Sequence, residues 1–284
     1  MILVTGATGP VGRETVKQLV AAGARVRALT RDPSKANFDP GVEVVAGDLG
    51  KPETLPEALA DVERVFVLVP SLRSADGWSY DPNIAHAAKG ADVRHLVRLS
   101  VIGAQPPVED DPYTAYHLAG ERAMEETGLP WTFLRPGQFM TNALYHAEAI
   151  KTQSLVRQPY LHVKQAAIDP RDIAAVAAAV LLGDGHEGKA YPLSGPEALS
   201  TAEQATKIAE ALGREITLVD VPPEQSREES LAMGLPVEMV DGIMRHMADE
   251  SGRCGQVYGT VREITGREPR TFGDWVRDHV DAFR

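Results

Sequence analysis

The sequence predicts an α/β fold in which a doubly wound parallel sheet carries a smaller C-terminal α/β lobe. Through residues 1–134, short β-branched runs alternate with helical stretches, which is typical of βαβ units and a parallel sheet. The strands are apolar along their whole length, so helices are expected to cover both faces of the sheet. A glycine-rich turn directly after the first strand is the third observation in favour of this fold.

The side-chain pattern predicts each element of the first part in turn. Ile2–Thr5 is an apolar, β-rich strand. Pro10–Ala22 has apolar residues at helical spacing, and Gly23 is a typical residue to end the helix. The further strands are predicted at 25–29, 42–45, 65–69, 96–99 and 131–134, and the further helices at 52–60, 82–89 and 112–127.

The pattern loosens after Leu134. Residues 168–182 indicate a strand end, a turn at Asp169-Pro170 and a long alanine-rich helix. We expect the main domain to comprise residues 1–134 and 163–198, and the smaller lobe, over the carboxyl edge of the sheet, to comprise 135–162 and 199–284. The remaining elements are predicted as a strand at 191–193, a helix at 201–212, a strand at 216–219, two helices within 224–247 and a closing helix at 272–283.

Composition excludes several classes of function. The 284 residues carry a formal net charge of −11, which does not suit nucleic acid or an anionic membrane surface. A single cysteine, Cys254, rules out an internal disulfide, and the histidines lack metal-ligand spacing, so no metal is expected. The longest apolar run, 173–182, is about half a membrane span, and no secretory signal is evident. We expect a cytoplasmic protein; no pattern indicates a particular oligomeric state.

The turn after the first strand has the spacing of a dinucleotide-binding loop. Gly6, Gly9 and Gly12 suit a tight turn, a close approach of pyrophosphate to the backbone, and close packing of helix on strand. The N–H groups of the following helix would face the phosphates. A plain structural turn is the alternative, but the position in a βαβ unit favours a Rossmann-type dinucleotide site. Its contacts are expected to include the residues between the glycines, Thr8, Pro10 and Val11.

The end of the second strand favours NADP as the cofactor, with NAD as the alternative. Arg31 is the first side chain past the strand and Lys35 follows a turn later, and a guanidinium can bind a 2′-phosphate in bidentate fashion. Asp32 could instead neutralise Arg31 or bind the ribose of NAD. The other cofactor contacts are expected at Asp48 and Leu49 beside adenine, and at Val69 and Pro70 beside the nicotinamide ribose.

Several motifs resemble the NmrA-like family of atypical short-chain dehydrogenases/reductases, over nearly the whole chain. They are Thr5-Gly6-x-x-Gly9-x-x-Gly12, Arg31-x-Pro33-x-Lys35, Gly128-Leu129-Pro130-Trp131-Thr132-Phe133-Leu134-Arg135-Pro136-Gly137, Ile168-Asp169-x-x-Asp172-Ile173-Ala174 and Thr271-Phe272. His117-x-x-x-Glu121 is similar to the quinone-reductase and triphenylmethane-reductase-like branch. The resemblance implies NAD(P)H binding and either reduction of quinones, dyes and phenolic ethers or non-catalytic sensing of the NADP state.

The catalytic candidates are Ser100, Tyr113 and His117. Short-chain dehydrogenases typically use Ser and Tyr-x-x-x-Lys, and here His117 stands where the lysine would be. A free imidazole is mostly neutral at pH 7, so it lowers the pKa of a tyrosine far less than an ammonium group does. Either Tyr113 or His117 could be the acid, or His117 could anchor the ribose, because both lie on one helix face with Glu121. Glu121 could orient His117 or belong to a charged surface.

The chain beyond the sixth strand is expected to line the substrate site. Pro136 and Gly137 would pass beside the cofactor, and Phe139, Met140 and Tyr145 suit a planar aromatic or quinone, although a core role is as plausible. Trp78 lies on a loop that could form a lid.

Together these features predict an NAD(P)H-dependent oxidoreductase that transfers hydride to an aromatic, quinone-like or otherwise conjugated small molecule. Such acceptors need little help from a strong acid, which suits the missing lysine. The high Arg and Ala content indicates a GC-rich bacterium, where tailoring of a secondary metabolite would be a fitting role. The alternatives are a non-catalytic NADP-sensing regulator and nicotinamide-assisted tailoring of an aromatic polyketide.

Overall fold

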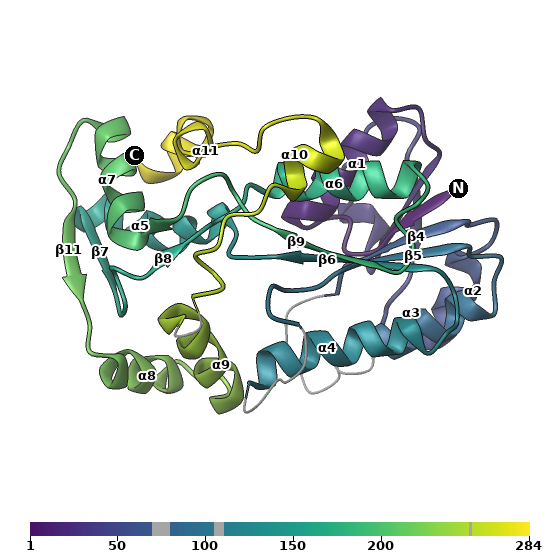
Figure 1. The fold of residues 1–284 in the computed structure, drawn as a ribbon, viewed down its shortest axis with the longest axis horizontal. Coiled ribbons are helices and arrows are strands. Elements are labelled where there is room, and N and C mark those ends of the chain that lie inside the picture. The colour runs from purple at the N-terminus through teal and green to yellow at the C-terminus, as the bar shows by residue number, and fades with distance from the viewer. Residues whose placement is uncertain (70–79, 105–110, 250–251) are drawn as a thin grey trace.

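The fold is a seven-stranded parallel sheet with helices on both faces, which confirms the predicted class. The structure is a computed structural model that describes residues 1–69, 80–104, 111–249 and 252–284 (Figure 1). The strand order is β3-β2-β1-β4-β5-β6-β9. The strands are β1 (Ile2–Val4), β2 (Val26–Thr30), β3 (Glu43–Ala46), β4 (Arg64–Val67), β5 (His95–Leu99), β6 (Trp131–Pro136) and β9 (Lys189–Leu193).

The central strand β1 shows how the sheet is buried on both sides. Its neighbours are β2 and β4, with Leu3 opposite Arg27 on one side and Val65 on the other. Leu3 belongs to one apolar cluster, while Ile2 and Val4 belong to the other, because successive side chains of a strand point to opposite faces. This arrangement explains why the strand is apolar throughout.

Two layers of helices cover the sheet (Figure 1). One layer consists of α1 (Pro10–Ala21), α6 (Pro170–Leu182) and α10 (Thr260–Thr265), and the other of α2 (Leu55–Ala58), α3 (Tyr80–Lys89) and α4 (Pro112–Glu125). The sequence places residues 199–284 in the smaller lobe, yet α10 packs on α6 and β9 of the main domain. Within the described residues, no helix has both the length and the apolar character that a membrane span needs.

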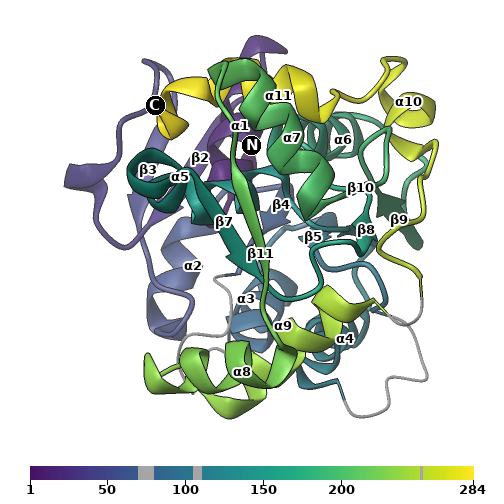
Figure 2. The same cartoon turned by 90° about the vertical axis from the view of Figure 1, so that its left-hand side faces the viewer.

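The smaller lobe lies beyond the carboxyl edge of the sheet (Figures 1 and 2). Its core is formed by Met140, Ile150, Phe272 and Trp275 with their neighbours. Two short sheets, β7 paired with β11 and β8 paired with β10, complete it. Its elements are η4 (Met140–His146), α5 (Ala147–Gln153), β7 (Leu155–Gln158), β8 (Lys164–Gln165), β10 (Leu199–Ser200), α7 (Thr201–Leu212), β11 (Thr217–Asp220), α8 (Pro223–Ala232), α9 (Val237–Ala248), α11 (Phe272–His279) and η5 (Val280–Phe283).

A charged network at the start of α6 ties the C-terminal segment to the main domain. Asp169 caps α6 and bonds the side chains of Arg171 and Arg270, which both also pair with Asp278 of α11. Asp172 is buried and accepts a hydrogen bond from the backbone N–H of Arg270 at 2.8 Å. Burial raises the pKa of Asp172 to about 6, against the opposing effect of that hydrogen bond.

This raised pKa predicts a pH-dependent stability difference between the wild type and Asp172→Asn. A carboxyl whose pKa is higher in the folded than in the unfolded state stabilises the fold below about pH 4, and that contribution is lost as the pH rises through about 6. The wild type should therefore lose up to about 3 kcal/mol relative to Asp172→Asn between these pH values. Urea denaturation at intervals between pH 4 and 7 measures it, with the exposed Asp281→Asn as control. Parallel stability curves for the wild type and Asp172→Asn would contradict the prediction.

Candidate dinucleotide and catalytic site

The glycine turn after β1 has the backbone that the sequence predicts. Gly6 has φ +54°, and a Cβ there would lie 2.9 Å from the Cβ of Leu68. Thr5 Oγ1 holds that segment in place by accepting from Leu68 N at 2.8 Å and donating to Leu68 O at 2.9 Å. The turn is thus pressed against the end of β4, where only glycine fits.

Gly9 and Gly12 have different roles in the turn. A Cβ on Gly12 would lie 2.3 Å from the carbonyl oxygen of Gly6, so this glycine is needed for close packing. A Cβ on Gly9 would meet only that same oxygen, at 3.3 Å. Gly9 is also the N-cap of α1, whose first turn contains no acidic residue and no side-chain cap. The N-terminus of α1 therefore has backbone N–H groups that no side chain caps, and there is space beside Gly9. Both features fit the pyrophosphate of a dinucleotide.

The loop after β2 leaves Arg31 available for a phosphate. Asp32 accepts from the N–H and O–H of Ser34 and pairs with Lys35 Nζ at 3.0 Å, which lowers the pKa of Asp32. Arg31 is exposed, and it forms no ion pair with any residue in the described ranges. Asp32 thus pairs with Lys35 and not with Arg31. Neutralisation of Arg31 by Asp32, which would argue against NADP as the cofactor, is therefore not observed.

Arg13 brings a second guanidinium to the same loop. Its Nη1 donates to the carbonyl oxygen of Asn37 at 3.1 Å, and its guanidinium lies 5.7 Å from the centre of the Phe38 ring. Sequence reasoning missed Arg13, although its position directly after Gly12, at the mouth of the predicted phosphate site, is a signal that could have drawn attention to it.

The other predicted cofactor positions line the ends of β3 and β4. Asp48 Oδ1 accepts from the N–H of Gly50 at 2.9 Å and so shapes the turn after β3, while Leu49 is buried. Val69 is partly buried and packs on the same core cluster as Leu49. Their contacts with a cofactor stay predictions. Pro70 and Trp78 lie outside the described residues.

The three catalytic candidates lie where β5 ends and α4 begins. Ser100 follows β5 and is buried, and its Oγ has no hydrogen-bond partner. On α4, His117 packs edge-on against Tyr113, with ring centres 5.0 Å apart, and its buried Nδ1 also lacks a partner. His246 of α9 completes the cluster, with its ring centre 6.0 Å from that of Tyr113.

Burial keeps the ionisable groups of this cluster uncharged. It lowers the pKa of His117 well below the usual value, and the positive charge of Arg98, with that of His246 when its ring is protonated, lowers it further. It raises the pKa of Tyr113 to about 12, with Asp111 adding to the shift. At neutral pH the site therefore offers a neutral imidazole and a neutral phenol, each able to donate one hydrogen bond.

Glu121 has neither of the two roles considered for it. It is buried and forms a bidentate ion pair with Arg135 of β6, with Arg135 Nε 2.9 Å from Glu121 Oε1. Glu121 therefore holds α4 against β6 and is neither a support for His117 nor part of a charged surface. A second buried pair, Arg98 with Asp81, lies against Gly120 of α4, where a Cβ would be 2.2 Å from Arg98 Nη2.

The expected substrate residues divide between core and surface. Met140 is fully buried in the core of the smaller lobe, and Phe139 packs on the core of the main domain. These are the core positions that the sequence left open as an alternative. Tyr145 is 86% exposed, and it lies near enough to Tyr113 to influence the pKa of that phenol. A substrate contact by Tyr145 stays a prediction.

The residues present fit a nicotinamide dinucleotide. Pro136 and Gly137 carry the chain away from β6 beside Ser100: Pro136 O accepts from Ile102 N at 2.8 Å, and Gly137 N donates to Leu193 O at 3.0 Å. The unpartnered Ser100 Oγ and His117 Nδ1 are buried at the same edge of the sheet as the glycine turn. Buried polar atoms normally have partners, so these two can accept hydrogen bonds from a ligand or donate them to it. No group of three His, Cys, Asp or Glu side chains that could bind a metal occurs in the described part of the chain.

Comparison with known proteins identifies the family of this chain. A family profile described as NAD(P)H-binding matches residues 6–184. The chain is 40% identical over 284 residues to the (4-alkanoyl-5-oxo-2,5-dihydrofuran-3-yl)methyl phosphate reductase of Streptomyces griseus, covering all of this chain and 99% of that protein. It is also 40% identical over 289 residues to the NAD(P)H azoreductase of Xenophilus azovorans, again covering 100% of this chain and 99% of the relative.

Solved structures show the same fold. The NADPH-dependent quinone oxidoreductase of Escherichia coli, complexed with NADPH, matches with a TM-score of 0.86 and 25% identity, over 98% of this chain and 99% of the other. The triphenylmethane reductase of Citrobacter sp., complexed with NADP(H), matches with a TM-score of 0.84 and 25% identity over the same shares.

The fold and the site define a dinucleotide-binding protein of the Rossmann class. The chain belongs to the NAD(P)H-binding family, in its NmrA-like, atypical short-chain dehydrogenase/reductase group. The resemblance drawn from the sequence motifs is thereby confirmed, and so is an NAD(P) cofactor.

We expect substitutions at Gly9 and Gly12 to have different effects. Gly9→Val should abolish NADPH binding with a near-normal melting temperature, because its side chain would enter the space of the pyrophosphate while meeting little protein. Gly12→Ala should lower both the NADPH affinity and the melting temperature, because its Cβ would clash with the backbone of the turn itself. Calorimetric titration with NADPH and thermal melting distinguish the two. Undiminished NADPH binding by folded Gly9→Val would refute this assignment.

Proposed function

We propose that the protein is an NAD(P)H-dependent reductase of an aromatic, quinone-like or otherwise conjugated small molecule. The observation that carries this proposal is a pair of buried, unpartnered polar atoms at the edge where the glycine turn lies: Ser100 Oγ after β5, and His117 Nδ1 on α4, where the His117 ring packs against Tyr113. The relatives support it, since they are named for reduction of a furanone phosphate, azo compounds and quinones. Tailoring of a secondary metabolite fits such an acceptor.

The residues of the chain have distinct tasks in this proposal. A bound nicotinamide cofactor supplies the hydride. The glycine turn and α1 hold the pyrophosphate, and Arg31 holds the 2′-phosphate. Ser100 and His117 orient the nicotinamide ribose or the acceptor by hydrogen bonds from neutral groups. Tyr113, whose pKa is about 12, keeps its proton at neutral pH and can donate a hydrogen bond to the acceptor oxygen.

A conjugated acceptor suits this neutral site. The negative charge that hydride brings to a quinone or azo group is delocalised, so a hydrogen bond can suffice where a simple ketone would need a strong acid. The direct test is oxidation of NADPH and NADH by the purified protein with a panel of small quinones and anthraquinones, alongside cofactor titration. An NADP-sensing regulator would bind the cofactor and show no turnover with any member of the panel.

Cofactor preference tests the role of Arg31. We expect the wild type to bind NADPH more tightly than NADH, and Arg31→Ala to remove most of the difference, because Arg31 forms no ion pair within the described residues. A charge-assisted hydrogen bond contributes about 1.5–3 kcal/mol, or about ten- to a hundredfold in affinity. The control is Lys17→Ala, which removes an exposed cation of α1 that pairs with Glu14. Equal affinity of the wild type for both cofactors would contradict the preference.

The pH profile and two variants test the role of His117. We expect turnover to be flat from about pH 7 to 9 and to fall only below about pH 6.5, because a lowered pKa makes the neutral ring the active form. His117→Ala should keep a near-normal melting temperature and lose about 10²–10⁴-fold in rate. His117→Asn, whose amide can replace Nδ1, should recover part of that loss.

Two outcomes would change the assignment of the acid. A rate that rises as the pH falls through the imidazole pKa would make the imidazolium the proton donor. A loss in Tyr113→Phe comparable to that in His117→Ala would make the tyrosine the acid and leave the histidine as its support. If His117 only anchors the ribose, its removal should weaken cofactor binding instead.

A further inference from the structure

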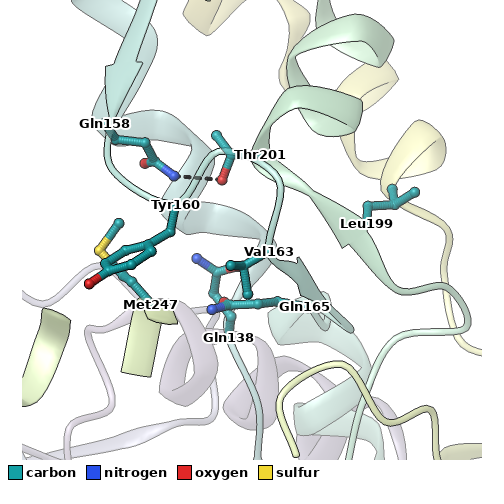
Figure 3. Close-up of a pocket in the computed structure, with 8 residues that line it drawn as sticks. All are labelled: Gln138, Gln158, Tyr160, Val163, Gln165, Leu199, Thr201 and Met247. Carbon is teal, nitrogen blue, oxygen red and sulfur yellow. Dashed lines mark hydrogen bonds between the residues drawn. The ribbon is translucent and has the colours of Figure 1, made fainter. Parts of the chain in front are cut away.

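A polar pocket lies in the smaller lobe, between β7, β8 and α9 (Figure 3). Its open volume is about 250 Å³, and its interior has room for a group about the size of one water molecule. Three amide side chains, Gln138, Gln158 and Gln165, line it together with Thr201, Tyr160 and Met247. Lysine, arginine, aspartate and glutamate are absent from its lining in the part of the chain that the structure describes.

The amide of Gln158 is already hydrogen-bonded to other side chains of the protein. Gln158 Nε2 donates to Thr201 Oγ1 at 2.6 Å, which joins the end of β7 to the start of α7. Burial lowers the pKa of the neighbouring His146, and a side-chain hydrogen bond with Gln158 opposes that shift. Gln158 is therefore occupied on both sides by protein groups.

The amide of Gln165 is fixed by one hydrogen bond, but its oxygen has no hydrogen-bond partner. Its Nε2 donates to the carbonyl oxygen of His246 at 3.1 Å, which fixes the orientation of the amide. Its Oε1 is buried without a hydrogen-bond partner, and the residue is only 6% exposed. Figure 3 shows the Gln165 side chain beside those of Gln138 and Val163. A buried carbonyl oxygen without a donor is costly, and a water molecule or the donor group of a ligand can offset that cost.

The pocket adjoins the catalytic candidates. Met247 lines it, and the preceding residue, His246, packs against Tyr113. On the other side, Gln138 directly follows Pro136 and Gly137 at the end of β6. A molecule bound near Tyr113 and the nicotinamide could therefore extend a short substituent toward Gln165.

We propose that this pocket binds an uncharged hydrogen-bond-donating substituent of the substrate, a hydroxyl or an N–H, through Gln165 Oε1. The proposal rests on the reductase function and specifies its substrate class: a conjugated acceptor with a short donor arm. A phosphate or carboxylate is excluded from this position, because a lone-pair acceptor would face another acceptor and no cation lines the pocket. The room available restricts the arm to a group of the size of a hydroxymethyl.

Three matched ligands test the proposal in the wild type without turnover. They are 1,4-naphthoquinones with a 2-hydroxymethyl, a 2-methoxymethyl or a 2-ethyl group, titrated by calorimetry into protein saturated with NADP⁺, which carries no hydride. The hydroxymethyl compound should bind about tenfold more tightly than the other two, since only it donates a hydrogen bond. Equal affinity of the hydroxymethyl and ethyl compounds, or no measurable binding of any of the three, would overturn the proposal.

Variants assign the effect to Gln165. Gln165→Met, of similar length and apolar, should bind the hydroxymethyl and ethyl compounds equally, at the wild-type affinity for the ethyl compound. The control is Gln153→Met, which alters an exposed glutamine at the end of α5 and should keep the tenfold preference. A preference that survives in folded Gln165→Met would refute the proposal.

Turnover of the same compounds with NADPH separates this proposal from the reductase function. If the ethyl compound is reduced as efficiently as the hydroxymethyl compound and binds equally well, the reductase function stands and the donor site is wrong. If none is reduced but the hydroxymethyl compound alone binds tightly and requires Gln165, the donor site stands and quinone reduction is wrong.

Discussion

The buried ion pair between Arg98 and Asp81 is the constraint on which the site depends. Both side chains are almost entirely removed from water, so each charge is tolerable only while the other is present. The pair joins β5 to α3, and α4 can lie against it only because Gly120 has no side chain. Ser100 follows two residues after Arg98, and His117 precedes Gly120 by less than one helical turn. The ion pair therefore sets the distance between the two sides of the catalytic cluster.

The same pair also influences the chemistry of the cluster. The positive charge of Arg98 lowers the pKa of both His117 and Tyr113, although burial outweighs it at the tyrosine. A typical short-chain dehydrogenase has a lysine, which is cationic at neutral pH, where this chain has His117. Here Arg98, which lies against Gly120 of α4, is instead paired with the carboxylate of Asp81, while the residue in the lysine position is a neutral imidazole. Such a site orients by hydrogen bonding, and it suits acceptors that stabilise negative charge themselves.

Local patterns predict the main domain well and the smaller lobe poorly. All seven strands of the large sheet, its glycine turn and α1 have apolar runs or breakers that act over a few residues. By contrast, β8 and β10 contain two residues each and exist only because they pair with each other. The sequence also does not show which ion pairs form: Glu121 bonds Arg135, and Asp32 bonds Lys35 instead of its neighbour Arg31. The sequence identifies charged residues in such cases, but tertiary packing selects their partners.

The site lies between the main domain and the smaller lobe, and we expect the main domain to bind the cofactor and the smaller lobe to recognise the substrate. The residues expected to hold the cofactor lie in turns at the carboxyl ends of parallel strands, where backbone geometry dictates glycine and the N-terminus of α1 provides donors. The residues that could recognise a substrate, such as Gln165, His246 and Met247, come from short strands and a helix of the smaller lobe. Their positions depend on side-chain contacts, so one substitution there can alter the shape of the pocket without disturbing the sheet. The cofactor half of the site is constrained by the fold itself, whereas the substrate half can vary among proteins that share this fold.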